Sequence, residues 1–125
     1  MLIVLPPSES KTPAQTGKSM DHTSLSLPEL TEARAQVAAA LATTSRRAEA
    51  FEILKVSTNL GDEVRRNTVL DTAPATSAAR LYSGVLFDAL DLPSVDTASR
   101  RRATRQIRIV SALYGVVRLT DKVAP

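Results

Sequence analysis

Two apolar runs at opposite ends of the chain constrain its fold more than any other feature. Residues 2–5 form one run, which Pro6 and Pro7 end abruptly, and residues 107–113 form the other. Short apolar runs bounded by proline or polar residues are typical of strands buried on both faces. The long segment between them rules out hairpin pairing, so we expect the two strands to pair in parallel.

Helical patterns fill most of the segment between the two predicted strands. Ser26 followed by Glu29 has the spacing of a capping box, with Pro28 in the first turn, and predicts a helix that ends near residues 43–45. A further helix is predicted over residues 46–54 and, after a turn at residues 56–58, another that extends to residue 67. Two more are predicted over residues 74–90, with a kink or a close backbone contact at Gly84, and over residues 96–106. The chain is therefore predicted to be one α/β domain, residues 1–125, with helices packed on a small parallel or mixed sheet.

The composition excludes several kinds of chemistry. The chain has no cysteine and one histidine, so thiol nucleophiles, disulfides, iron–sulfur ligation and most zinc sites are excluded, and no metal or cofactor is expected. Aromatic residues make up only 3%, which argues against base-stacking platforms for single strands. The first apolar run lacks a basic leader and is too short for a signal peptide or membrane span, so we expect a cytoplasmic protein without membrane contact.

Polar loops follow both predicted strands, at residues 6–11 and 111–121. In an open parallel sheet the loops after the carboxyl ends of the strands line one crevice, so the two loops are expected to face each other. The side chains there with useful chemistry are Ser8, Glu9, Lys11, Tyr114 and Arg118.

These loops allow an enzymatic reading and a structural one. In the first, the chain is an enzyme that acts on a nucleotide or nucleobase. Glu9 is the general acid or base, and Lys11 and Arg118 hold an anion. Ser8 and Tyr114 lie in the same pocket. In the second, the first loop is a solvated turn, the tyrosine is buried, and the arginine pairs with a nearby aspartate.

Basic residues are concentrated in two further segments. The formal net charge is +3 with a pI near 9.7, and residues 100–118 contain six arginines and no acidic residue. Such runs either follow a phosphate backbone or form a solvated helix face. Side-chain donors and helix N-terminal N–H groups around the predicted short helices at residues 46–67 could also bind phosphate, although Ser57 could simply cap a helix. The candidate nucleic-acid contacts are Lys11, Lys55, Ser57, Arg65, Arg66, Arg100, Arg101, Arg102, Arg105 and Arg118.

Several motifs, taken in order along the chain, resemble the YaaA family of bacterial peroxide-stress proteins. They are Leu-Pro-Pro-Ser-Glu-Ser-Lys at 5–11, Leu-Pro-Glu-Leu at 27–30, Leu54 with Ser57 and Asn67, Tyr82 with Gly84 and Val85, and Ser-Ala-Leu-Tyr-Gly-Val-Val-Arg at 111–118. Family members are longer, so we expect this chain to correspond to their N-terminal half, with the sheet incomplete and the missing C-terminal half as its partner.

The resemblance also implies a function. It implies a protein that protects against hydrogen peroxide by limiting iron available for Fenton chemistry, and that binds double-stranded DNA through a helix-hairpin-helix beside a positively charged cleft. The matching stretch is about residues 46–67, with Lys55 and Ser57 at the turn, although the usual glycine–hydrophobic–glycine hairpin is absent. The leading hypothesis is therefore a non-enzymatic, duplex-binding stress protein.

Overall fold

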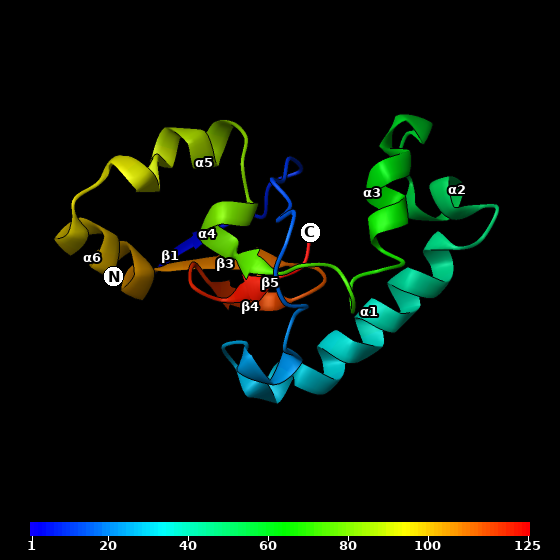
Figure 1. Cartoon of the computed structure of the whole chain (residues 1–125), viewed down its shortest axis with the longest axis horizontal. Helices are drawn as coiled ribbons and strands as arrows, with labels where there is room; N and C mark the ends of the chain where they lie inside the picture. The colour runs from blue at the N-terminus through cyan, green and yellow to red at the C-terminus, as the bar shows by residue number, and fades with distance from the viewer.

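A small mixed sheet lies at the centre of the molecule. The computed structural model describes residues 1–125, and its strands β1 (Ile3–Leu5) and β3 (Ile107–Ser111) pair in parallel, with Ile3 opposite Ile107. β3 also pairs antiparallel with β4 (Gly115–Arg118), which gives the strand order β1-β3-β4 (Figure 1). The α/β class and the small mixed sheet predicted from the sequence are confirmed.

The second predicted loop is a β-hairpin rather than a free loop. β3 ends at Ser111, not near residue 113, because the Ser111 hydroxyl oxygen accepts hydrogen bonds from the backbone N–H groups of Leu113 and Tyr114 and closes a tight turn. Gly115 completes the turn with φ of +68°, a conformation that favours glycine. The chain then returns along β3 as β4, so Arg118 lies opposite Arg108, away from the turn.

Three helices project from one side of the sheet (Figure 1). They are α1 (Thr31–Ser45), α2 (Ala50–Leu54) and α3 (Gly61–Arg66), with 3-10 turns at Pro28–Leu30 and Thr58–Leu60. The predicted capping box is not formed, because the Ser26 hydroxyl donates to Asp121 instead. The only buried residue of α1 is Arg34, since this long helix contacts the rest of the fold mainly near its two ends.

The predicted helix over residues 74–90 is divided into three pieces. β2 (Thr76–Ser77) pairs antiparallel with β5 (Lys122–Val123), and two short helices follow, α4 (Ala78–Leu81) and α5 (Val85–Leu90). The break falls at Gly84, where φ is +97° and an added Cβ would lie 3.6 Å from Ser10 Cβ. The sequence predicted a kink or a close backbone contact at Gly84. The chain is broken there rather than kinked, and the neighbouring Ser83 N–H donates to Ser10 O at 3.2 Å.

The arginine-rich helix forms where the sequence predicts it. α6 (Thr97–Gln106) begins at Asp96, whose carboxylate accepts hydrogen bonds from the backbone N–H and the hydroxyl of Ser99. α6 and α5 lie at the end of the molecule opposite to α2 and α3 (Figure 1). None of the helices is long and apolar enough to cross a membrane.

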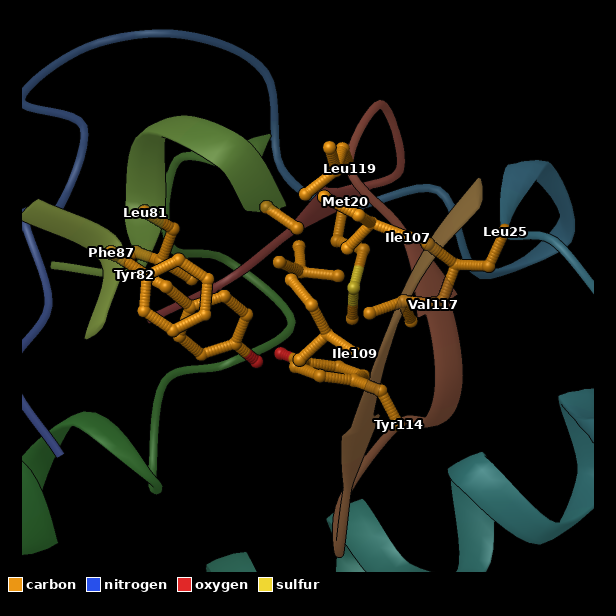
Figure 2. Packing of buried hydrophobic residues seen from close by; sticks show 12 residues of the cluster. Met20, Leu25, Leu81, Tyr82, Phe87, Ile107, Ile109, Tyr114, Val117 and Leu119 are labelled. Carbon is orange, nitrogen blue, oxygen red and sulfur yellow. The ribbon is translucent and has the colours of Figure 1, made fainter. Parts of the chain in front are cut away.

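The hydrophobic core lies on one face of the sheet. Ile109 and Val117 from adjacent strands are fully buried against Leu81 of α4 and the stacked rings of Tyr82 and Phe87 (Figure 2). The other face is open: Val4 is 57% exposed and Val110 44%. The expectation that the strands are buried on both faces is therefore wrong for these residues, because their side chains remain in contact with solvent.

Candidate functional site

A groove of about 480 Å³ brings together two cations that are far apart in the sequence, Lys11 and Arg66. Lys11 comes from the loop after β1, and Arg66 and Asn67 come from the end of α3. We call this the Lys11 groove. Its remaining wall is Leu41, Leu54, Val56, Leu60, Glu63, Val64, Ala112 and Pro125.

The loop that carries Lys11 is held by backbone hydrogen bonds. Thr12 N–H donates to Leu81 O at 2.7 Å, and Ser83 N–H donates to Ser10 O and to Ser8 Oγ, each at 3.2 Å. The Ser8 hydroxyl in turn donates to Ser10 O. Ser8 therefore has a structural role in this loop, and the position of Lys11 is tied to the end of α4.

The other wall of the groove is built by the α2–α3 pair. α2 ends at Lys55, which adopts the left-handed conformation with φ of +54°, and the Ser57 side chain then accepts a hydrogen bond from Asn59 N–H at the next turn. Val64 is buried, and Asn67 Nδ2 donates to Ser45 Oγ of α1 at 3.1 Å. Lys55 thus takes a conformation usually given to glycine, which is absent from this turn.

The charges in the groove do not balance locally. Burial is the main reason that the pKa of Lys11 lies below its ordinary value of 10.5, and the positive charge of Arg66 lowers it further, whereas Glu63 and Glu9 act in the opposite direction. Arg66 has only a long contact with Glu63, 4.0 Å from Nη1 to Oε1. The groove is lined by two partly buried cations, Lys11 and Arg66, and by one carboxylate, Glu63. This excess of positive charge is suited to binding an anion such as phosphate.

Other candidate cations near α3 lie outside the groove wall. Lys55 and Arg65 are exposed, and Arg65 donates to Asp62 at 3.0 Å on the same helix. Both residues belong to the α2–α3 pair, whose other residues form one wall of the groove. Exposed pairs of this kind contribute little to stability, so Arg65 can exchange its carboxylate for another anion at small cost.

α6, which carries most of the candidate arginines, lies at the end of the molecule opposite to α2 and α3 (Figure 1), and residues of α2 and α3 line the Lys11 groove. Arg101, Arg102 and Arg105 are exposed, whereas Arg100 donates to the carbonyl oxygens of Pro93 and Val95. They form a separate basic surface, and the structure does not bring them into one cleft with Lys11.

The residues of the enzymatic reading are not assembled in one pocket. Tyr114 is buried and donates its hydroxyl to Ala124 O at 3.0 Å, while Glu9 is exposed. Arg118 is exposed at the far end of β4, about 10 Å along the strand from the turn at Gly115. Its side chain does not pair with Asp121, which instead accepts a hydrogen bond from the Arg118 backbone N–H.

One buried charged residue that organises this region, Arg34, was not identified from the sequence. Arg34 is 2% exposed and donates to the carbonyl oxygens of Ser26, Leu27, Tyr114 and Val116, at distances from 2.7 to 3.1 Å. It joins α1 to the β3–β4 hairpin. Its spacing from Leu30, Val37 and Leu41 places it on the apolar stripe of the helix, and this is the signal in the sequence that could have indicated burial.

The chain matches a family described as Peroxide stress protein YaaA over residues 1–125. It is 46% identical over 125 residues to a UPF0246 protein of Streptomyces coelicolor, and 44% identical over 123 residues to a UPF0246 protein of Corynebacterium efficiens. In both cases the match covers 98% of this chain and 48% of the relative. The chain therefore belongs to the YaaA family of peroxide stress proteins, and it spans about half the length of these curated relatives.

Proposed function

We propose that this cytoplasmic peroxide-stress protein binds double-stranded DNA, with backbone phosphates held at the Lys11 groove, and so helps to limit iron-dependent oxidative damage. The observation that carries the proposal is the convergence of Lys11 and Arg66 on one groove with a single lining carboxylate. A phosphate between them would relieve the repulsion that helps to lower the pKa of Lys11.

The surroundings of the groove support a duplex as the ligand. Lys55 and Arg65 extend the positive charge along the α2–α3 pair, which we propose acts as a helix-hairpin-helix-like element over residues 46–67. Contacts of this type read phosphates and not bases, so binding should depend strongly on salt and weakly on sequence. Aromatic side chains on which single-stranded bases could stack are scarce, at 3% of the chain.

The proposal is tested by fluorescence anisotropy with a labelled duplex at several salt concentrations. Lys11→Gln and Arg66→Gln should each weaken binding and each reduce the slope of log affinity against log salt by about 1, the loss of one phosphate contact. The matched control is Arg47→Gln, because Arg47 is 58% exposed in a 3.7 Å pair with Glu49 outside the groove. If all three variants bind like the parent chain, or lose affinity equally, the groove is not the DNA site.

The basic surface of α6 needs its own test, since it lies away from the groove. We propose that Arg101, Arg102 and Arg105 contact a second stretch of phosphates, because all three are exposed. The double variant Arg101→Ala with Arg102→Ala should then lower affinity on long duplexes more than on short ones. An equal effect on both lengths would place all contacts on one surface.

A second candidate function is catalysis on a nucleotide or nucleobase. One observation favours it: a partly buried lysine with a lowered pKa can act as a base or nucleophile once it loses its proton. Lys11 would carry this role beside Arg66 and Asn67, without Tyr114 or Arg118. Lys11→Arg separates the two functions, since it keeps the positive charge for DNA binding and removes a titratable amine.

A further inference from the structure

A second cationic pocket is lined in part by residues of α4 and shares no lining residue with the Lys11 groove. Two cavities of about 330 and 630 Å³ adjoin each other there, because both are lined by Ser77 and Arg80. Their polar side chains include Ser77, Arg80, Arg100, Thr104, Thr120 and Lys122. We call this the Arg80 pocket. Its lining residues include three cations and no carboxylate.

The donors of the Arg80 pocket are largely unused within the protein. Arg80 is exposed and makes no side-chain hydrogen bond or ion pair. Arg100 uses only Nη2, which donates to Pro93 O at 3.0 Å and Val95 O at 3.3 Å, so its Nη1 and Nε remain available. These two bonds fix the Arg100 guanidinium at the pocket wall before any ligand arrives, which reduces the entropy lost on binding.

The frame of the pocket is rigid, because it is built from paired backbone. Thr76 and Ser77 pair with Val123 and Lys122, and Ala79 N–H donates to Leu119 O at 3.0 Å. On the opposite wall, the Thr104 hydroxyl donates to Arg100 O at 3.0 Å and is therefore occupied. The hydroxyls of Ser77 and Thr120 make no hydrogen bond within the protein, so both are free to donate to a ligand.

We infer that the Arg80 pocket binds the phosphate group of a small phosphorylated molecule. The smaller cavity is lined by the guanidiniums of Arg80 and Arg100 and by two free hydroxyls, with no carboxylate, which suits a phosphate dianion. The ammonium of Lys122 lines the adjoining cavity and adds positive charge beside it. The cavities also leave room beside the phosphate for the rest of the molecule. The inference does not depend on DNA binding at the Lys11 groove.

The experiment follows backbone amide resonances of the full chain by NMR during titration with inorganic phosphate and with ribose 5-phosphate. We expect saturable shifts at residues 77–80 and 119–122, and none with ribose. Arg80→Gln should weaken binding about tenfold or more, the effect of losing a charge-assisted hydrogen bond. Arg47→Gln is the matched control, because Arg47 is an arginine with a side chain 58% exposed that does not line the pocket.

One result that would overturn the inference is the absence of saturable shifts at these residues with both ligands, and another is equal weakening by Arg80→Gln and Arg47→Gln. Arg100→Gln provides a second variant, so the inference stays testable if Arg80→Gln fails to fold. Displacement of ribose 5-phosphate by duplex DNA would assign the phosphate to a DNA backbone and overturn the small-molecule assignment.

The same variants separate this inference from the proposed function. If only the Lys11 groove binds DNA, Arg80→Gln should leave duplex affinity unchanged while Lys11→Gln lowers it. Loss of ribose 5-phosphate binding with duplex binding intact would confirm two separate phosphate sites.

Discussion

Ser26 and Asp121, 95 residues apart in the chain, are joined by two hydrogen bonds. The Ser26 backbone N–H donates to Asp121 Oδ2 at 3.2 Å and its hydroxyl donates to Asp121 Oδ1 at 2.9 Å. The same carboxylate accepts the Arg118 N–H at 3.0 Å, and the Ser26 carbonyl accepts from the buried Arg34. One buried carboxylate therefore ties the entry of α1 to the end of β4.

The first prediction concerns this carboxylate. Asp121→Ala should lower the free energy of unfolding by about 3 kcal/mol, because three donors lose a charged acceptor in a buried place. Ser26→Ala should cost about 1 kcal/mol, because the backbone bond survives. Urea unfolding measures both values. Asp71→Ala is the control, since its side chain is 82% exposed, and a loss there as large as at Asp121 would contradict the assignment.

The second prediction concerns the reactivity of Lys11. Because its pKa is lowered by burial and by Arg66, Lys11 should be acetylated by trace acetic anhydride at a lower pH in the folded chain than in the same chain unfolded in urea. Arg66→Gln should move the Lys11 profile toward that of the unfolded chain. If the pH profiles of Lys11 acetylation coincide in the folded and the unfolded chain, Lys11 does not lie in a partly buried site beside Arg66.

The same shift makes stability depend on pH. Between the lowered pKa of Lys11 and its ordinary value of 10.5, the unfolded chain holds a proton that the folded chain has released. This term therefore makes the free energy of unfolding rise with pH across that window. Lys11→Met should remove this part of the pH dependence.

The third prediction concerns the two tyrosines, which are the only ones in the chain. Burial raises the pKa of Tyr82 and of Tyr114 above 10.0, and Tyr82 raises that of Tyr114 further. Figure 2 shows the two phenol oxygens pointing toward each other inside the core. Absorbance at about 295 nm should show less phenolate near pH 10 in the folded chain than in the unfolded chain, which should be about half ionised there.

The sign of this effect on stability is opposite to that of Lys11. Above pH 10.0 the unfolded chain loses phenol protons that the folded chain retains, so this term lowers the free energy of unfolding as pH rises. Phenolate absorbance should therefore appear together with loss of the near-ultraviolet circular dichroism of the folded core. Ionisation of both tyrosines at pH 10 without unfolding would contradict their burial.

The fourth prediction compares two glycines. Gly115→Ala should destabilise the protein by about 1–3 kcal/mol, because φ is +68° and the new Cβ would lie 2.9 Å from Leu30 Cδ1. Gly61→Ala should stabilise it by about 1 kcal/mol, since Gly61 is helical and its nearest neighbour to an added Cβ is 4.0 Å away. Thermal unfolding of both variants measures the difference, and equal effects would contradict the hairpin geometry.

The sequence alone determined the features that depend on neighbouring residues. Asp96 caps α6 because an aspartate three residues before a serine N–H satisfies the first turn wherever the helix lies. The break at Gly84 and the strand ending before Pro6 follow in the same way from local backbone preferences. Parallel pairing of β1 with β3 also followed, because the long connection excludes a hairpin.

Only the tertiary structure decided which side chains meet. Ser26 has the spacing of a capping residue, but Asp121 offers its hydroxyl a charged acceptor, and a charged acceptor forms the stronger bond. Lys11 and Arg66 line one groove, while Arg118 faces away from it, because the chain after Ser111 folds back as β4. These side-chain contacts join distant parts of the chain. Because such contacts produce no periodicity or fixed spacing in the sequence, they could not be predicted from it.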